Sequence, residues 1–225
     1  MAGELRKEKL VVVMMLALGL LLCPVYSKKS SSDNPADDLA VIVNQNRTAN
    51  KLPALHDNPG LACIALQYIQ AYQGQCNEVG PNGEKPADYE FNQTFADNCG
   101  VDPMTISDIS GIVLACETKY QDASYAFSNL LFLDSKSVTT LLNKNQTEFG
   151  AGISGYAGGS PYFWCILFSH GGSNSTFVFS AGKAKYQQTG CFSGTAEPCS
   201  GAQSMRHFSF SLILASIIGL VVAIF

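Results

Sequence analysis

The pattern of hydrophobic and polar positions divides the 225-residue chain into two apolar ends and a mixed middle. The first apolar run, residues 10–22, follows three basic residues, and Val25-Tyr26-Ser27 then supplies the small residues at which signal peptidase cuts. The run is shorter than the roughly 20 residues that a membrane-spanning helix needs. The pattern therefore predicts a signal peptide over residues 1–27.

A second apolar run, residues 208–225, closes the sequence without a charged residue. Before it come three small residues, Ser200, Gly201 and Ala202, and a short polar spacer, an order that is typical of a GPI-attachment signal. A single transmembrane helix is the alternative, but no basic residue follows the run to fix an orientation. We expect residues 201–225 to be removed and Ser200 to carry the anchor. Because the spacer is short, Ser193 is the second choice for attachment.

Helical spacing recurs in the middle of the chain. Asp37 and Asp38 are typical of a first turn, and Leu39, Ile42 and Val43 follow at helical spacing. A second helix is predicted to begin at Pro59, at the position where proline is tolerated, and to end at Gly74. Two further helices are predicted, over residues 122–133 and 135–143.

Short apolar runs of strand length occupy the rest of the middle. We expect a strand at 109–115 and three more after the helices, joined by paired glycines; the three are 149–156, 162–169 and 176–181. Residues 75–107 are rich in glycine and proline and are predicted to be a loop. Helices first and an antiparallel meander last predict an α+β domain. We place this domain at residues 37–190, after a flexible N-terminal tail at 28–36 and before an anchor-proximal stalk at 191–200.

Charge and glycan acceptors agree with an extracellular location. Removing both ends takes away two acidic and four basic residues and lowers the net charge from −4 to about −6. This charge argues against nucleic acid or an acidic membrane surface as partner. Four N-glycosylation sequons remain, at Asn46, Asn92, Asn145 and Asn174.

Seven cysteines remain once the predicted signal peptide is removed. In an oxidising compartment most of them should pair, and an odd number leaves one over. Four of them enclose the predicted loop and are expected to form two bridges, although the sequence leaves three pairings open; they are Cys63, Cys76, Cys99 and Cys116. Cys191 and Cys199 are placed to pair with each other, and Cys165, in an apolar strand, is expected to be a buried thiol.

Two stretches resemble the CAP superfamily (cysteine-rich secretory, antigen 5, pathogenesis-related 1). One is LAVIVNQNRTANKLPALHDNPGLACIALQYI, with N-x-x-R, L-P-x-L and L-A-x-x-A; the other is DSKSVTTLLNKNQTEFGAGISGYAGGSPYFWCILFS. Together with the predicted anchor and the four-cysteine pattern, they resemble a plant family of uncharacterised GPI-anchored proteins. The resemblance implies CAP-like helices packed on a small, mainly antiparallel sheet that disulfides stabilise.

The resemblance also implies where a metal-binding cavity would lie. Many CAP proteins line a cavity with two histidines and two glutamates, and the matching positions here are Tyr68, Ile112 and Ser137, with the fourth near residues 130–133. None of these positions carries histidine or glutamate, which are the ligands that such a site needs. We therefore expect no metal, no cofactor and no catalytic residue of this type.

Other catalytic signals are weak. His170 follows Ser169, but neighbouring residues of a strand point to opposite faces, and His56 lies in a link between helices. The G-x-G-x-x-G of residues 150–155 follows a helix and precedes a strand, the reverse of a nucleotide-binding turn, and so indicates close strand packing or a bulge. Two groups of side chains keep two interpretations each. The acidic group fits solvated loop charges, with a calcium site or an acid–base pair as the alternative. The aromatic group fits core residues, with the lining of a ligand cleft as the alternative. The two groups are Asp88, Glu90 and Asp97, and Tyr156, Tyr162, Phe163 and Trp164.

These observations predict a non-catalytic glycoprotein, GPI-anchored in the outer leaflet of the plasma membrane and facing the extracellular side. It would bind an extracellular protein, peptide, glycan or small apolar ligand. The alternative is a secreted hydrolase with an unrecognised active site. A purely structural wall glycoprotein is disfavoured because the sequence has no Pro/Ser-rich low-complexity segment.

Overall fold

The computed structural model describes residues 34–72, 76, 79, 86–87, 89–102, 109–155, 160–171, 177, 184–186, 188–195 and 199. The predicted signal peptide and the predicted GPI-attachment signal lie outside the described residues, as does Ser200. The described part contains five α-helices, a mixed sheet of five strands and three disulfides, which confirms the predicted α+β class. Within it, no helix combines the length and the hydrophobicity needed to cross a bilayer.

The first two helices form where the sequence predicts them, because each has a proline in its first turn and an asparagine cap. Helix α2 spans Pro35–Ala49, and the Oδ1 of Asn34 accepts a hydrogen bond from the Ala36 N–H. Helix α3 spans Pro59–Ala71, and Asn58 caps it in the same way. Such caps satisfy N–H groups that have no partner inside the helix, at about 1 kcal/mol each.

The region predicted as a loop contains a helical segment. A π-helical turn, η2 (Phe91–Phe95), continues directly into α4 (Ala96–Cys99). Prediction of a loop over all of residues 75–107 was therefore wrong for this part. The apolar residues Phe91, Phe95 and Cys99 recur at helical spacing and are all buried, so burial of this face outweighs the surrounding glycines and prolines.

Two more helical segments lie between residues 123 and 141, and both agree with the sequence prediction. The first consists of α5 (Ala123–Ala126) and the π-helical turn η4 (Phe127–Leu131). The second is α6 (Ser135–Leu141). Aspartates cap both segments, since Asp122 and Asp134 accept hydrogen bonds from backbone N–H groups of the first turn.

The sheet is mixed, with its strands in the order β1-β3-β4-β2. Strands β2 (Ile109–Glu117), β3 (Glu148–Ser154) and β4 (Tyr162–Ser169) pair antiparallel. The two-residue strand β1 (His56–Asp57) pairs parallel to β3, and β5 (Cys191–Phe192) pairs antiparallel to it. The predicted strand at 176–181 lies outside the described residues except for Phe177, which is buried.

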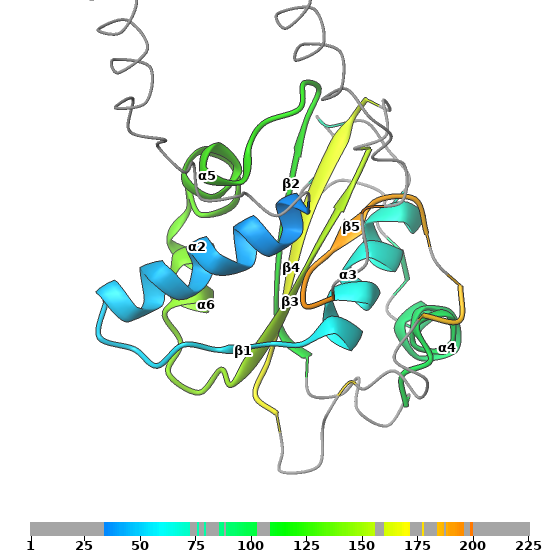
Figure 1. The fold of residues 1–225 in the computed structure, drawn as a ribbon, viewed down its shortest axis with the longest axis horizontal. Helices are drawn as coiled ribbons and strands as arrows, with labels where there is room; N and C mark the ends of the chain where they lie inside the picture. Colours follow the sequence, from blue (N-terminus) through cyan, green and yellow to red (C-terminus); the bar gives the residue numbers. More distant parts are fainter. Residues whose placement is uncertain are drawn as a thin grey trace, which may run out of the picture. The chain divides into compact units, whose positions relative to one another are not determined.

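Both faces of the sheet are covered, as Figure 1 shows for α2 and α3 on opposite sides of β3 and β4. Alternate residues of β4 divide between two cores: Phe163, Cys165 and Leu167 pack on the α3 side, and Trp164, Ile166 and Phe168 on the side of α2, α5 and α6. Helix α3 lies unusually close to β3, because a Cβ atom at Gly152 would sit 2.5 Å from the Leu66 nitrogen. Close strand packing, predicted for these glycines, is therefore confirmed.

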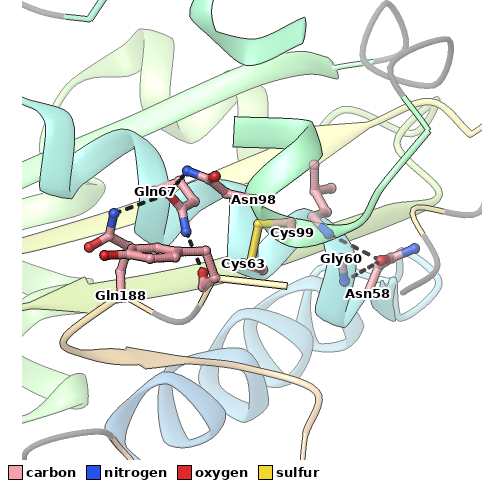
Figure 2. Close-up of a disulfide and its surroundings, with 9 residues drawn as sticks. Asn58, Gly60, Cys63, Gln67, Asn98, Cys99 and Gln188 are labelled. Atoms are coloured by element: carbon pink, nitrogen blue, oxygen red, sulfur yellow. Dashed lines mark hydrogen bonds between the residues drawn. A yellow bond between two sulfur atoms is a disulfide. The ribbon is translucent and has the colours of Figure 1, made fainter. Parts of the chain in front are cut away.

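Disulfides attach the helical segment and the neighbouring loop to this core. Cys63 on α3 is bonded to Cys99 on α4, and Cys76 is bonded to Cys116 on β2. The two bridges expected among these four cysteines are thus present. Beside the first bridge, the buried Gln67 side chain accepts a hydrogen bond from Asn98, as Figure 2 shows. It also donates one to the backbone carbonyl of Tyr186.

The domain extends beyond its predicted limits at both ends. Residues 34–36, expected in a flexible tail, are buried, and Asn34 donates a hydrogen bond to the Phe192 carbonyl. Cys191 and Cys199, expected in a stalk, are also buried and are bonded to each other. Apolar burial and the bridge therefore hold residues 34–36 and both cysteines on the domain.

One buried cation joins α2 to α6. Arg47 in the last turn of α2 has no exposed surface, and its guanidinium donates to the carbonyls of Pro53, Leu141 and Asn143. Leu141 is the last residue of α6 and Asn143 follows two residues later, so the cation lies at the C-terminal end of this helix, where the helix dipole favours a positive charge. This is the arginine of the N-x-x-R motif, and its planar group connects three separate segments.

Candidate binding site

A groove of about 450 Å³ runs along one face of α2 beside strand β1. Its floor and walls come from helix positions three and four residues apart, which lie on the same face of a helix. Exposed Val41, together with Ala40, forms the apolar part of the groove. The polar residues that line it are Asp37, Asn44, Gln45, Thr48 and Asp57.

A side-chain clamp holds β1 beside the helix. The Asn44 side chain accepts a hydrogen bond from the Leu55 N–H at 2.8 Å and donates one to the Leu55 carbonyl at 2.9 Å. Residues 56–57 then continue parallel to β3. The clamp and the short parallel ladder therefore fix Asp57 at the edge of the groove.

Asp57 is partly buried and has a hydroxyl partner. Ser193 donates from its Oγ to Asp57 Oδ1 at 2.6 Å, and the same Oγ accepts a hydrogen bond from the Ala151 N–H. Burial raises the pKa of Asp57 to about 6, the charge of Asp37 adds to the increase, and the bond from Ser193 opposes it. This carboxyl therefore changes its charge at mildly acidic pH.

Asp37 is the second carboxyl of the groove. It accepts a hydrogen bond from the Gly194 N–H at 3.0 Å, and burial raises its pKa, as does the neighbouring charge of Asp38. Because Asp37 and Asp57 repel each other as anions, a positive group between them would lower the pKa of both. The arrangement suits a ligand with an ammonium or guanidinium group.

The positions of the CAP cavity do not converge on one site. Tyr68 on α3 is buried against Phe91 and Phe95, whereas Ser137 is buried on α6 at the opposite face of the sheet. Ile112 on β2 is 46% exposed. Ser137 donates a hydrogen bond to its own helix cap, Asp134, and so has a structural role.

The other catalytic candidates are separated or engaged in structural contacts. Ser169 is fully buried, and its Oγ accepts a hydrogen bond from the Gly171 N–H, while His170 next to it is exposed. His56 is exposed in β1, opposite Glu148. Among the described residues, no group of three or more metal-ligating side chains could hold a metal ion.

The acidic and aromatic groups are also distributed through the fold. Asp97 forms an exposed ion pair with Lys185 at 2.6 Å, Glu90 precedes η2, and Asp88 lies outside the described residues. Phe163 and Trp164 are buried on opposite faces of the sheet, which agrees with their reading as core residues. Tyr162 packs edge-on against Tyr120, and Tyr156 lies outside the described residues.

The structure places only some of the predicted processing residues. Asn145 is exposed in the turn before β3, and Asn46 is half-buried in α2, where its side chain accepts a hydrogen bond from Asn50. Asn92 lies in η2, and Asn174 is outside the described residues. Ser193, the second choice for anchor attachment, is fully buried under Asp57.

Sequence reasoning missed the groove. The sequence pattern identifies Asp37 only as a residue of a first helical turn, and it connects neither Asp57 nor Ser193 with Asp37. The register of β1 beside β3, which brings these residues together, depends on a two-residue ladder with no hydrophobic pattern of its own. A usable signal was the helical spacing of the small or polar positions 37, 40, 41, 44 and 48 on one face of α2.

Comparisons with known proteins give little similarity. No family model matches the chain, and no curated protein matches it. Among solved structures, a cysteine-rich secretory protein from Staphylococcus aureus is similar at 15% identity and a TM-score of 0.41. The match covers 63% of this chain and 40% of that protein. A likeness of this size does not assign the chain to a family.

Proposed function

We propose that the protein is a non-catalytic, GPI-anchored glycoprotein of the cell surface, a divergent CAP-like module that binds an extracellular ligand. The observation that carries this proposal is the use of six of the seven cysteines outside the predicted signal peptide in three disulfides. The seventh, Cys165, is buried. Such a pattern is typical of a domain that folds in the secretory pathway and works outside the cell.

The ligand that suits the groove carries a positive charge. Two carboxylates with raised pKa values flank an apolar wall made by Ala40 and Val41. A lysine or arginine side chain fits this combination, since its stem covers apolar surface while its charged end meets the carboxylates. Net negative charge would add long-range attraction. We therefore infer a basic peptide segment of a partner protein as the ligand.

A binding role is favoured over a catalytic one by the state of the hydroxyl groups. Ser193, whose hydroxyl is bonded to the groove residue Asp57, is fully buried and is also held by Ala151. Ser169 is buried in a turn contact on another part of the sheet. A nucleophile needs access to its substrate and a base within hydrogen-bond reach, and neither hydroxyl has both.

Anchoring is tested on intact cells that express the full chain. We expect phosphatidylinositol-specific phospholipase C to release the protein into the medium, because a processed C-terminus leaves only a lipid in the membrane. A known GPI-anchored protein in the same cells controls for enzyme activity. If the protein stays in the membrane while the control is released, the tail is a transmembrane helix.

Ligand binding is tested with two lysine variants of apolar residues that are exposed to a similar extent. Val41 in the groove and Ile112 on β2 are 49% and 46% exposed, so Val41→Lys and Ile112→Lys place the same charge on opposite parts of the domain. The probes are fluorescent decapeptides, one rich in lysine and arginine and one rich in glutamate. We expect the basic peptide alone to bind, and Val41→Lys to weaken it about tenfold, or 1.4 kcal/mol. Equal binding by both variants would refute the groove as the binding site.

A further inference from the structure

The groove beside α2 contains two carboxyl groups and no basic side chain. Asp37 and Asp57 are the ionisable residues that line it, and the other lining residues are neutral. Within the part of the chain that the structure describes, neither carboxyl forms an ion pair; the ion pair found there joins Lys185 and Asp97. The groove therefore has no positive charge of its own. Either a cationic ligand or a proton would neutralise its carboxylates.

Asp57 is the more enclosed of the two carboxyls. Its Oδ1 accepts the 2.6 Å hydrogen bond from Ser193, which is fully buried. In the ladder between β1 and β3, Asp57 is paired with Phe149, which has no exposed surface. Burial and a neighbouring anion both favour the protonated form of a carboxyl, and they raise the pKa of Asp57 to about 6, with burial as the larger cause.

The charged groups around Asp57 come from the elements packed beside it. Helix α2 contributes Asp37, which itself lies next to Asp38, and β1 contributes His56, whose positive charge opposes the effect of Asp37. Glu148 on β3 precedes the residue paired with Asp57 and so lies on the opposite face of the sheet. Helix α3 has no charged residue, and β5 adds only the hydroxyl described above. Of these groups, His56 alone is positive.

We propose that binding in the groove depends on pH: the groove holds its basic ligand at neutral pH and releases it in mild acid, when Asp57 takes up a proton. This inference rests on the basic ligand proposed above. Because the cation and the proton compete for the same carboxylate, each weakens the binding of the other by the same factor. A protonated Asp57 also loses the charge-assisted hydrogen bond to an ammonium or guanidinium group.

The size of the effect follows from the fraction of chains in which Asp57 is charged. With a pKa of about 6, nearly all chains carry this charge at about pH 7.5, and roughly one in ten carries it at about pH 5. Since apparent affinity falls in proportion to the binding-competent fraction, a basic peptide should bind about tenfold more weakly at the lower pH. Lysine and arginine stay charged throughout this range, so the peptide itself does not change.

The test measures binding of the fluorescent decapeptide rich in lysine and arginine to the full chain, purified in mild detergent from a eukaryotic secretory host. We expect the Kd of the unmodified chain to be about tenfold higher at about pH 5 than at about pH 7.5. Asp57→Asn keeps the shape of the side chain without its charge, so it should bind weakly at both pH values with little difference between them. His56→Gln is the matched control on β1 and should keep the pH dependence.

Two further variants should move the midpoint of release in opposite directions. Ser193→Ala removes a hydrogen bond that favours the charged form of Asp57, so release should begin at higher pH. Asp37→Asn removes a neighbouring negative charge, so the midpoint should move to lower pH. These shifts report on Asp57 even if its own replacement folds poorly, and thermal unfolding checks that each variant is folded.

The other outcomes overturn the inference and separate its failure from that of the proposed function. Equal binding of the peptide at both pH values leaves the basic-ligand groove intact but refutes its dependence on pH. A dependence that persists in Asp57→Asn, or that disappears in His56→Gln, belongs to another group. Midpoints that do not move in Ser193→Ala and Asp37→Asn also contradict control by Asp57. If the peptide binds at no pH, the proposed function fails, and this inference fails with it.

Discussion

Replacing Gly152 by alanine should destabilise the domain strongly, because α3 lies directly over this position. The new Cβ atom would lie 2.5 Å from the Leu66 nitrogen, 2.8 Å from the Ala65 carbonyl carbon and 2.9 Å from the Leu66 Cα. All three atoms belong to the helix backbone and cannot rotate away. Since carbon reaches its best contact distance at about 3.5 Å, the helix must retreat by roughly 1 Å.

The loss of stability follows from the contacts between α3 and the sheet that this movement weakens. The core between α3 and the sheet includes Leu61, Ile69, Cys165 and Leu167, all of which have at most 2% exposure. A gap of about 1 Å removes up to half of the attraction at each contact across it. We expect a loss of about 3 kcal/mol, the upper part of the range for an overpacked core. For a domain of this size, the melting temperature should fall by about 6–12 °C.

The assay is urea unfolding followed by circular dichroism, with Gly111→Ala as the matched control. An added Cβ at Gly111, in the same sheet, would overlap the Cγ2 atom of Thr140 on α6, but this is the end of a side chain, which can shift where a helix backbone cannot. Alanine also reduces the entropy of the unfolded chain, so this variant should lie within about 1 kcal/mol of the original. If the two variants were equally stable, the close approach of α3 to β3 would not be the reason why glycine is needed at position 152.

Three further changes test the bridge, the buried cation and the groove. Cys63→Ser should leave Cys99 as a free thiol in peptide maps and lower the free energy of unfolding by about 2–5 kcal/mol. The destabilised variant should be retained in the secretory pathway, and its normal secretion would contradict this prediction. Arg47→Lys should cost about 2–3 kcal/mol in urea unfolding, because an ammonium group cannot reach all three carbonyls, which lie in two separate segments; an unchanged midpoint would show that the guanidinium does not hold these segments together. Because the folded-state pKa of Asp57 is raised from 3.8 to about 6, the unfolded chain loses this proton first, so stability should fall as pH rises through this range by about 2 kcal/mol. Asp57→Asn should flatten this slope, and a slope that persists in this variant belongs to other groups.

The sequence predicted those elements whose signals are local. Asp37 and Asp38 mark the first turn of α2, Pro59 marks the start of α3, and short apolar runs of strand length mark β3 and β4. Gly150 and Gly152 were also interpreted correctly, because a glycine pair in a strand indicates close packing whatever lies on the other side.

Elements that depend on distant partners were missed. Segment 91–99 is helical because its apolar face packs on α3 and is bonded to it through Cys99, and neither condition is visible in a local window of glycine and proline. Strands β1 and β5 have two residues each, too few to show an alternation of apolar and polar positions. They form because the backbone of β3 has unpaired N–H and C=O groups with which they can hydrogen-bond. The groove was missed for the same reason, because β1 and β5 place Asp57 and Ser193 beside it.

The pairing of β5 with β3 has a mechanical consequence. A force applied to the chain beyond Cys199 passes through the bridge to Cys191 and so bypasses the seven residues between them. It then acts on β3, an inner strand, because Cys191 is paired with Ile153. Because the bridge is covalent, tension cannot peel these last residues away one at a time. The load falls on the best-packed part of the domain, and the peripheral helices are left unstrained.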